Sequence, residues 1–573
     1  MVTGMNENYD ADVIVIGAGG GGAVAAKELA VRGVKVLVLE AGPWYGNRNW
    51  PAPNSERGAV SSSSYEDLSI DLLHKSFTDL EEDMNDIVTG KFRWGPADRS
   101  RPPWLRKGGT PWQVSGVGGT TLHYFANSPR AIPQAIDNQW PITYSELVPY
   151  YERMEAQLPV HPAPISPKEE LFYYGAKGAG FQYSEGPNIT QPCYRRQVNA
   201  ILEVNPRVND PNFDLQSNNS VGCTLRGHCV NGCSEGPIVE AVAKRSTLVS
   251  LIPPALATGN VQIRPNAFVI RILTEEDGEL RARGVVYRDT WTGEQTELYA
   301  RVVVMAGGGV ETPRLWLNSA LPENPWVGKG LTNHWFDTVS GIFDEEVLLR
   351  TLGVPEINPF AGQNSAARVE YPGLGSIITY GMSPGIFAML SYGNSGGKYA
   401  ALNPPPPGAA WDVEGMVAGE QLKEFMREYR RTLSMLIFTD DQVDQRNEIV
   451  VDPELRDEHG PVPVIRYQPS EEDARKRDEL AGYAAEILRA AGARTVIRSN
   501  WRPEIFIHIM STMRMGFVVD EKCEAYQVKG LYIADGSVLF NGIGGPNPTL
   551  TIQALAARTA DMIWDKYFRE GAS

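Results

Sequence analysis

A single histidine near the C-terminal end carries a side chain suited to acid–base chemistry. His508 is one of seven histidines and lies in the stretch FIHIMSTMRMG between apolar neighbours. An imidazole titrates near neutral pH, so it can accept a proton from a substrate. In this stretch taken alone, a core histidine whose ring nitrogens bind backbone groups is the more common situation. Other parts of the sequence are needed to distinguish a structural histidine from a catalytic base.

Three of the five cysteines form a second group with chemical potential. Cys223, Cys229 and Cys233 follow the pattern C-x5-C-x3-C in a loop that contains glycine. Three thiolates are what a [3Fe–4S] cluster needs, so the spacing is compatible with an iron–sulfur site. The alternatives are buried thiols, a strained Cys229–Cys233 disulfide and, less readily, a zinc site that includes His228.

The third group is a glycine motif near the N-terminal end. Gly17, Gly19 and Gly22 give G-x-G-x-x-G, and Glu40 follows where this fingerprint has an acidic residue. Gly17 permits a tight turn, Gly19 lets the backbone approach a pyrophosphate, and Gly22 lets a helix pack close to a sheet. Glu40 can accept from ribose hydroxyls and would repel a 2′-phosphate. We expect a plain adenosine dinucleotide, and the motif alone does not distinguish NAD from FAD.

These motifs require particular elements to position them. Residues 12–16 are an apolar run typical of a buried parallel strand, and we predict a helix over 23–32 and a second strand over 35–39. In this order the helix N-terminus can bind a diphosphate. Near the other end, residues 531–534 predict a strand, and Asn547 to Leu550 open a helix with proline in its first turn.

The bulk composition limits the partners. The 573 residues carry a formal net charge of -16, which disfavours nucleic acid and anionic membrane surfaces. No apolar run is long enough to span a membrane, and the first residues lack the features of an export signal. We therefore expect a chain that does not span the membrane and is cytoplasmic, unless a partner that carries a signal takes it to the periplasm.

Several segments in order along the chain resemble the glucose–methanol–choline (GMC) flavoprotein oxidoreductases. The matching stretches are residues 17–43, 117–130, 140–155, 306–319, 327–335, 506–516 and 530–563. The resemblance is closest in character to bacterial FAD-dependent glucose and gluconate dehydrogenase large subunits and to pyranose and C-glycoside oxidases. It implies FAD as the cofactor.

The resemblance also implies an α/β fold. A Rossmann-like FAD-binding domain would be interleaved with an α+β substrate domain built on an antiparallel sheet. The FAD-binding domain would comprise 1–139, 225–335 and 500–573, and the substrate-binding domain 140–224 and 336–499. Within the last segment we predict strands over 376–380 and 447–452 and a helix over 420–436.

The resemblance assigns roles to single residues. His508 would lie over the flavin as general base, and Asn547 would bind the substrate oxygen. Apolar neighbours would then keep the imidazole neutral and exclude water. His123 would lie near the flavin dimethylbenzene edge, where packing is preferred to covalent attachment. The other implied cofactor contacts are Gly118, Gly119 and Thr120, Val269 at the adenine, Asp535 and Gly536, and Pro548 and Thr549 at a helix N-terminus facing the flavin N1–C2=O edge.

The implied reaction is oxidation of a CH–OH group by hydride transfer to flavin N5. The favoured donor is a secondary hydroxyl of a sugar, glycoside or polyol, and Trp94, Trp104 and Trp112 could stack on sugar rings near the entrance. Electrons would pass to a cytochrome or quinone, with a small partner subunit and a [3Fe–4S] cluster as further expectations. Thr224 and Ser234 depart from the cluster-binding relatives, which have cysteine and proline there. An oxidase that makes hydrogen peroxide and a non-redox lyase containing FAD are the alternatives.

Overall fold

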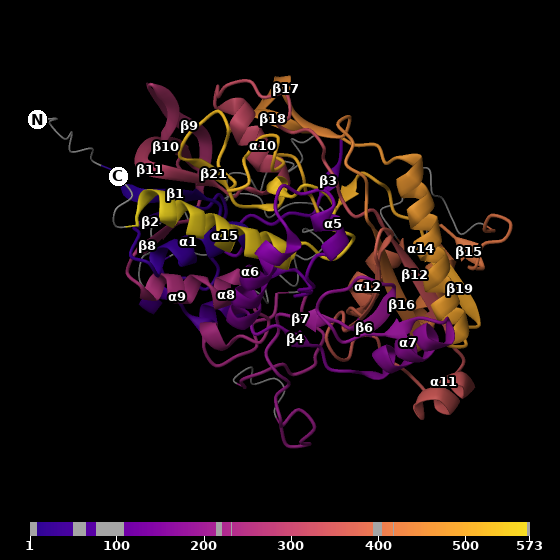
Figure 1. Cartoon of the computed structure of the whole chain (residues 1–573). Helices are drawn as coiled ribbons and strands as arrows, with labels where there is room; N and C mark the ends of the chain where they lie inside the picture. Colours follow the sequence, from indigo (N-terminus) through magenta and orange to yellow (C-terminus); the bar gives the residue numbers. More distant parts are fainter. Residues whose placement is uncertain are drawn as a thin grey trace, which may run out of the picture.

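The structure is a computed structural model that describes residues 9–49, 65–75, 108–213, 220–230, 232–392, 404–415 and 417–569. In these residues two large sheets lie apart from one another, one toward the left of Figure 1 and one toward the right. We call them the first and the second sheet. The α/β arrangement predicted from the sequence, with one mainly parallel and one mainly antiparallel sheet, is confirmed.

The first sheet is mainly parallel, with an antiparallel extension at one edge. Two of its strands, β1 (Ala11–Ile16) and β2 (Val36–Leu39), are apolar except for Asp12 because both of their faces are buried, as in other parallel sheets. In spatial order the strands are β8 (Val261–Arg264), β2 (Val36–Leu39), β1 (Ala11–Ile16), β11 (Gln295–Met305), β10 (Glu279–Asp289) and β9 (Ala267–Asp277), and β21 (Leu531–Ile533) also pairs with β11.

Two helices rich in small residues pack beside this sheet. α1 (Gly20–Ala30) and α15 (Thr549–Tyr567) lie side by side, α15 in yellow in Figure 1. Buried alanines on both helices allow the close approach. α1 begins three residues earlier than predicted because Gly20 and Gly21 already belong to its first turn. α6 (Tyr144–Gln157) packs against α15 in turn.

The second sheet is antiparallel except at its two edges, where β15 with β19 and β5 with β6 run parallel. Its strands in spatial order are β15 (Val413–Glu414), β19 (Thr495–Ser499), β12 (Phe336–Ile342), β16 (Thr432–Thr439), β14 (Gly375–Tyr380), β13 (Ala367–Tyr371), β6 (Cys193–Arg196) and β5 (Gln182–Tyr183). α14 (Glu471–Ala490) and α7 (Pro167–Gly178) pack together next to it. A capping box starts α14, since Ser470 and Asp473 each accept a hydrogen bond from the other's backbone N–H.

The helix predicted over 420–436 is wrong in its second half. The helix α13 covers Gly419–Arg427, and Thr432–Thr439 forms the strand β16. All eight side chains of β16 are buried between neighbouring strands and the layers packed on the sheet. Because both faces are buried, the strand contains the continuous apolar run Met435–Phe438, which periodicity alone does not distinguish from part of a helix.

The strands of the first sheet lie in residues 11–305 and 531–533, and those of the second in residues 182–499. The domain boundaries given above stay predictions. Other helices and strands are α5 (Pro133–Asp137), α8 (Thr247–Ser250), α9 (Ile252–Ala257), α10 (Gly308–Asn318), α11 (Glu345–Leu352), α12 (Pro384–Tyr392), β3 (Thr110–Pro111), β4 (His161–Pro162), β7 (Val198–Asn199), β17 (Glu448–Asp457), β18 (Gly460–Arg466) and β20 (Ile505–Phe506).

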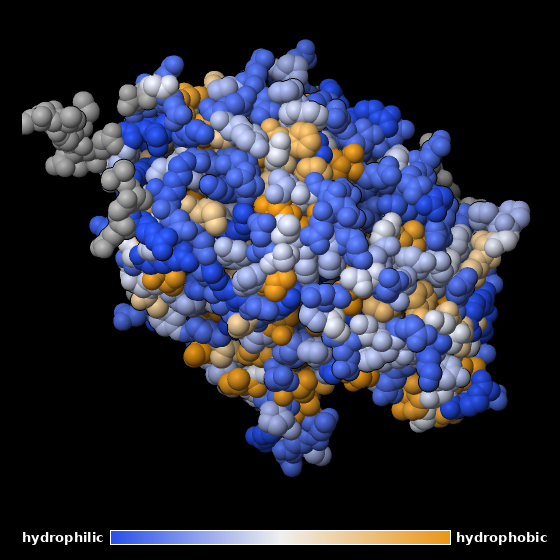
Figure 2. Space-filling view, viewed as in Figure 1, coloured by the Kyte–Doolittle hydropathy of each residue, from blue (hydrophilic) through white to orange (hydrophobic). Residues whose placement is uncertain are grey.

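The surface seen in Figure 2 is mainly hydrophilic, with apolar residues in small scattered groups. Within the part of the chain that the structure describes, no helix combines the length and the apolar character that crossing a membrane requires.

Candidate active site

One cavity of about 410 Å³ is lined by residues from both sheets. On the side of the first sheet its lining includes Gly17, Gly19 and Glu40, and we call this part the glycine region. The other part is lined by His508 and Asn547 together with side chains from the second sheet, and we call it the histidine region. The residues predicted as cofactor contacts line this cavity, apart from Gly22 and Gly118, which support its wall.

Two of the three glycines of the N-terminal motif, Gly17 and Gly22, are required by close backbone contacts. Gly17 has φ +100°, and a Cβ there would collide with the carbonyl oxygen of Ala306. A Cβ on Gly22 would collide with the carbonyl oxygen of Gly17. Gly119 lies back to back with Gly19, since its Cβ would come within 2.7 Å of the Gly19 Cα. The turn therefore keeps its shape only if these positions have no side chain.

Glu40 lines the cavity and also ties three stretches of backbone together. One carboxylate oxygen accepts from the N–H of Ala18 at 2.8 Å, and the other accepts from Gly42 and Gly116 at 2.9 Å each. Burial raises the pKa of this carboxyl group, and the backbone donors act in the opposite direction. Because a carboxylate offers about four lone pairs, acceptor capacity remains for the predicted ribose contact.

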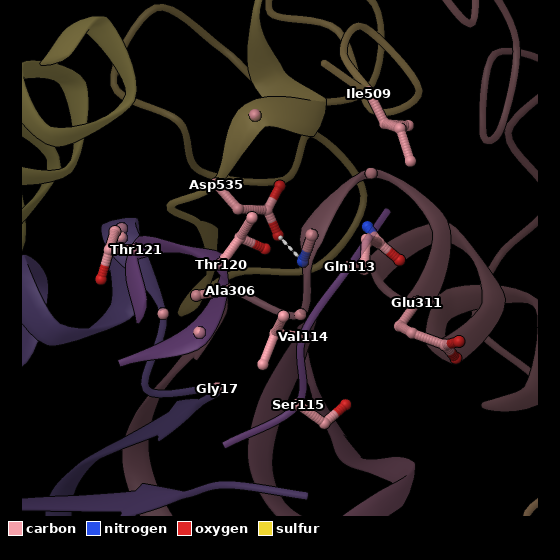
Figure 3. Close-up of a pocket in the computed structure, with 18 of the residues that line it drawn as sticks. Gly17, Gln113, Val114, Ser115, Thr120, Thr121, Ala306, Glu311, Ile509 and Asp535 are labelled. Carbon is pink, nitrogen blue, oxygen red and sulfur yellow. Dashed lines mark hydrogen bonds between the residues drawn. The ribbon is translucent and has the colours of Figure 1, made fainter. Parts of the chain in front are cut away.

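Asp535 holds the start of α10 in place. Its Oδ2 accepts from the N–H of Gly308 at 2.8 Å, drawn as the dashed line in Figure 3, and from the Thr312 hydroxyl at 2.5 Å. Its Oδ1 accepts from the N–H of Ser537 at 2.8 Å. Both oxygens are thus engaged by the protein, and Asp535 shapes this part of the cavity together with Thr120, which is labelled nearby in Figure 3.

Three helix N-termini line the cavity. They belong to α1 with Gly20 and Gly21, to α10 with Gly308 and Gly309, and to α15 with Thr549 after Pro548. At α1 and α15, free N–H groups and the positive end of the helix dipole favour negative charge, while at α10 the N–H of Gly308 already donates to Asp535. Val269 and its neighbours on β9 supply apolar side chains to the lining of the glycine region. This arrangement fits an FAD molecule, which has a diphosphate, a flat aromatic adenine and a flavin that becomes anionic when reduced.

His123 offers an unprotonated nitrogen in the cavity wall. Its Nδ1 lies 3.1 Å from the carbonyl oxygen of Val230, and a carbonyl only accepts, so Nδ1 carries the hydrogen. Burial, together with the charge of Lys244, lowers the pKa of His123 to about 3. Among the described residues its buried Nε2 has no hydrogen-bond partner. Packing against the flavin and covalent attachment through this nitrogen are both compatible with that geometry.

His508 belongs to a hydrogen-bond chain that ends at a backbone carbonyl. Its Nδ1 lies 2.9 Å from Nδ1 of His334, and Nε2 of His334 lies 2.8 Å from the carbonyl oxygen of Gly542. The carbonyl only accepts, so Nε2 of His334 carries the hydrogen. Burial lowers the pKa of His334 to about 4, so this ring is neutral and its Nδ1 is an acceptor. His508 therefore donates from Nδ1, and its Nε2 is left as the base nitrogen.

The surroundings also keep His508 neutral. Burial, the neighbouring His334 and the cation of Arg368 together lower the pKa of His508 well below its usual value. The Phe438 ring lies 5.3 Å from the imidazole and excludes water on one side. The unusual apolar setting of His508 thus has partners from distant parts of the chain, and the ring is ready to accept a proton.

Asn547 is oriented by a buried ion pair. Nη1 of Arg368 lies 3.4 Å from Oδ1 of Asn547, and a guanidinium only donates, so the amide oxygen faces Arg368. The amide nitrogen then faces Nε2 of His508, also at 3.4 Å. Arg368 is held by Glu370 at 3.0 Å, and Glu370 in turn pairs with Arg195 at 3.2 Å. A donor and a base nitrogen are therefore fixed side by side at the cavity.

His334, Arg368 and Glu370 were not among the residues predicted for the site. His334 lies in the stretch 327–335 that supported the family resemblance, so its position in that block was one available signal. Arg368 and Glu370 alternate around the apolar Val369 on β13, and all three are fully buried. Two opposite charges at a spacing of two in a buried strand predict an ion pair on one face of the sheet.

The cysteine loop packs behind the cavity and shows no metal site. In the described parts of the chain, no three His, Cys, Asp or Glu residues are grouped so that they could hold a metal ion. Cys223, Cys229 and Cys233 form no disulfide bond. Burial raises the pKa of each thiol, that of Cys233 to about 12. Lys244 donates to the carbonyl oxygens of Leu122, at 2.6 Å, and Cys229. The structure thus gives no support to the predicted [3Fe–4S] cluster.

Of the three tryptophans predicted near the entrance, only Trp112 can be placed. It lines the cavity and packs edge-on against Trp501, with ring centroids 5.8 Å apart. Trp94 and Trp104 lie outside the described residues.

Comparison with known proteins agrees with this fold. Two models of the GMC oxidoreductases match residues 210–336 and 444–556, and an FAD binding domain model matches 10–49. The chain is 27% identical to 2-methyl-1,2-propanediol dehydrogenase of Mycolicibacterium austroafricanum, over 96% of this chain and 95% of the relative. It is 26% identical to 6'''-hydroxyparomomycin C oxidase of Streptomyces lividus, over 96% and 91%. It is 25% identical to the fructose dehydrogenase large subunit of Gluconobacter japonicus, over 97% and 98%.

A solved structure of pyridoxine 4-oxidase has a similar fold. Its TM-score is 0.57 at 14% identity, with 96% of this chain and 99% of that chain covered.

Proposed function

We propose that this chain, a GMC oxidoreductase by its family models, its relatives and its fold, oxidises a CH–OH group with FAD and uses His508 as the general base. The observation that carries the proposal is the hydrogen-bond chain from Gly542 through His334 to His508. It leaves the base nitrogen unprotonated beside the amide of Asn547.

The protein residues divide the work in the histidine region. Bound FAD supplies the acceptor for the hydride that leaves the substrate carbon. His508 accepts the hydroxyl proton at Nε2, and its Nδ1–H bond to His334 becomes charge-assisted as it does so. Asn547 donates to the substrate oxygen and does not titrate. Phe438 and its apolar neighbours keep water from the charge that develops.

The proton accepted by His508 leaves on the cavity side. Behind the ring, the hydrogen-bond chain ends at the carbonyl of Gly542, which cannot be protonated at ordinary pH. The buried hydrogen-bond chain therefore orients the base but offers no route by which the accepted proton could leave. His508 returns to its neutral form when it gives this proton to a group in the cavity, such as water or the departing product.

The residues that would hold FAD are those of the glycine region. Gly17, Gly19 and Gly22 shape the turn before α1, whose N-terminus would face the diphosphate. Glu40 would bind the ribose. Gly119, Thr120 and His123 would line the flavin, with Gly118 supporting this wall, Val269 at the adenine and Asp535, Gly536, Pro548 and Thr549 at the remaining contacts.

The electron acceptor separates two versions of the function. A dehydrogenase that passes electrons to a quinone or cytochrome is the first candidate, and a fructose dehydrogenase large subunit among the relatives supports it. An oxidase that reduces oxygen to hydrogen peroxide is the second, and the relative 6'''-hydroxyparomomycin C oxidase supports it. In the dehydrogenase version, the chain would also bind a small partner subunit. A non-redox lyase would also need a base beside FAD and is the third candidate.

An anaerobic absorption experiment tests the proposal. Purified protein containing FAD is mixed with a panel of alcohols and sugars without air, and the visible flavin absorption is followed. We expect the flavin to bleach with at least one alcohol, whereas a lyase keeps its flavin oxidised while it consumes substrate. Admitting air and measuring hydrogen peroxide against product then separates an oxidase from a dehydrogenase. Flavin that no alcohol or sugar bleaches would contradict the proposed function.

A further inference from the structure

The histidine region has an apolar wall. Its side chains come from β12, β16 and α12 and from the segments around 112, 125, 382 and 507, and they belong to a single hydrophobic cluster. The members that line the cavity are Trp112, Phe125, Phe336, Met382, Ile386, Leu436, Phe438 and Ile507. We call this set the apolar wall.

The apolar wall reaches the base itself. The ring centroid of Phe438 lies 5.3 Å from that of His508, Phe336 lies 6.3 Å from Phe438, and Trp112 lies 6.1 Å from Phe336. The carbon skeleton of a substrate whose hydroxyl reaches Nε2 of His508 must therefore pack against these rings.

Few polar groups of the described residues lie in this region. His508 and Asn547 are needed for the reacting hydroxyl, and the Tyr124 hydroxyl already donates to the carbonyl of Arg245 at 2.9 Å. Asn127 lines the cavity and donates its amide nitrogen to Asn199 at 2.8 Å, while its buried Oδ1 has no partner.

One further unsatisfied atom is a donor. The buried Nε1 of Trp112 has no partner among the described residues. Like Oδ1 of Asn127, it is buried from solvent, so among the described residues neither atom adds to the hydrogen-bond partners that His508 and Asn547 offer a ligand. A ligand with more polar groups than these would bury the rest without partners.

We infer that the substrate of the proposed oxidation is an alcohol with an apolar aliphatic or aromatic frame that carries few or no further polar groups. The inference rests on the proposed function and narrows its donor. A sugar or polyol bears a hydroxyl on nearly every carbon, and each one buried without a partner lowers kcat/KM by about tenfold or more. The inference therefore departs from the sugar or polyol predicted from the sequence.

A matched pair of ring alcohols tests this. Cyclohexanol and myo-inositol share one carbon ring, but inositol carries a hydroxyl on every carbon. With FAD-containing protein, kcat/KM for flavin reduction should be about a thousandfold higher for cyclohexanol, since the described residues of this region offer the extra hydroxyls of inositol few partners. Benzyl alcohol and 1-hexanol extend the apolar series, and glucose and sorbitol extend the polar one.

The outcomes separate this inference from the proposed function. Faster reduction by the apolar series supports the inference. Equal or faster reduction by inositol, glucose or sorbitol overturns it and leaves the function standing. If no alcohol of either series reduces the flavin, the function fails and the inference falls with it.

A pair of variants on one strand checks that the apolar wall is responsible. Leu436→Asn places an amide of nearly equal size in the cavity lining and should lower the cyclohexanol to inositol ratio of kcat/KM by about tenfold. Leu433→Asn on the same strand lies in a different hydrophobic cluster and does not line the cavity, so its ratio should not change. Ratios measured in one preparation do not depend on how much of the variant folds. An unchanged ratio in Leu436→Asn would contradict the inference.

Discussion

The glycine region and the histidine region of the cavity are assembled in different ways. The glycine region depends on backbone geometry: Gly17 and Gly22 are close in sequence, and a Cβ on either would meet a carbonyl oxygen. The histidine region depends on side chains from four distant places, His334, Arg368, His508 and Asn547. The glycine region should lose its shape when a side chain is added at a glycine. The histidine region should lose activity when a ring proton moves or a charged side chain is removed.

The largest effect is expected when the base is removed. His508→Ala should retain FAD, because the glycine region is untouched, and should lower the rate of flavin reduction by about 10²–10⁴-fold. Anaerobic stopped-flow absorption measures the rate, and the flavin released on heating measures the FAD content. His161→Ala, a histidine outside the cavity lining, is the control. A near-normal rate in His508→Ala would rule out this residue as the base.

The second effect concerns the tautomer of the base. His334→Leu removes the acceptor for Nδ1–H of His508, which frees the ring to present a protonated Nε2, so we expect a fall of about 10–100-fold in the rate of flavin reduction. His334→Asn can supply an amide oxygen at this position and should recover most of the rate. If the two variants lose rate equally, His334 only fills space. The pair thus shows whether the histidine region depends on the direction of its hydrogen bonds.

The third effect is a change in pH dependence. The pKa of His508 is lowered by burial, by His334 and by Arg368, so the base stays neutral well below pH 6.5 and kcat/KM should stay flat there as the pH falls. Arg368→Gln removes a cation that lowers this pKa, so the acid limb should move to higher pH. The rate should also fall by about tenfold, because Asn547 loses its partner.

Arg368→Gln leaves Glu370 and Arg195 as a buried pair of opposite charge. The double variant Arg368→Met, Glu370→Leu also removes the carboxylate and leaves Arg195 as a buried cation without it, so it is the contrasting variant. It should show the same shift of the acid limb with a lower melting temperature than Arg368→Gln. An acid limb that does not move in either variant would remove Arg368 from the electrostatics of the site.

These two regions also differ in how much of them could be predicted from the sequence. The turn at Gly17, the helix after it and the acid at Glu40 follow from local sterics and spacing, and the structure has them within a few residues of the prediction. His508 and Asn547 were found through the family resemblance. The contacts of Arg368 and His334 are made across segments that only the folded sheet brings together, and no local pattern encodes a contact of that kind.

The same limit explains the two weaker predictions. The helix over 420–436 extended too far because the apolar run Met435–Phe438 of this fully buried strand does not alternate and can be taken for part of a helix. The cysteine spacing suggested a cluster, but spacing does not report whether thiolates converge, and here the loop is held by Lys244 and backbone carbonyls.

A smaller effect is expected in the glycine region when charge is changed without filling space. Glu40→Gln keeps the shape but replaces one carboxylate oxygen by an N–H₂ donor, which cannot accept from the N–H of Ala18 or Gly116. We expect FAD to bind about tenfold more weakly, with the reduction rate of the FAD-loaded protein unchanged. Titration of apoprotein with FAD, followed by flavin fluorescence, measures the affinity. A changed rate at full loading would show that the two regions are coupled.

The smallest effect is expected in the cysteine loop. Burial raises the pKa of Cys233 to about 12, so its thiol is protonated and a hydroxyl can take its place with little change in polarity or size. Cys233→Ser should therefore reduce flavin at the wild-type rate, and the purified protein should contain no stoichiometric iron. Iron analysis and the anaerobic rate are the measurements, and Lys244→Met, which removes the cation that holds this loop against Leu122, is the contrasting variant. Stoichiometric iron in the wild-type protein that is lost in Cys233→Ser would support the predicted [3Fe–4S] cluster. The cysteine loop would then be a third region, organised by a metal rather than by backbone geometry or by side-chain hydrogen bonds.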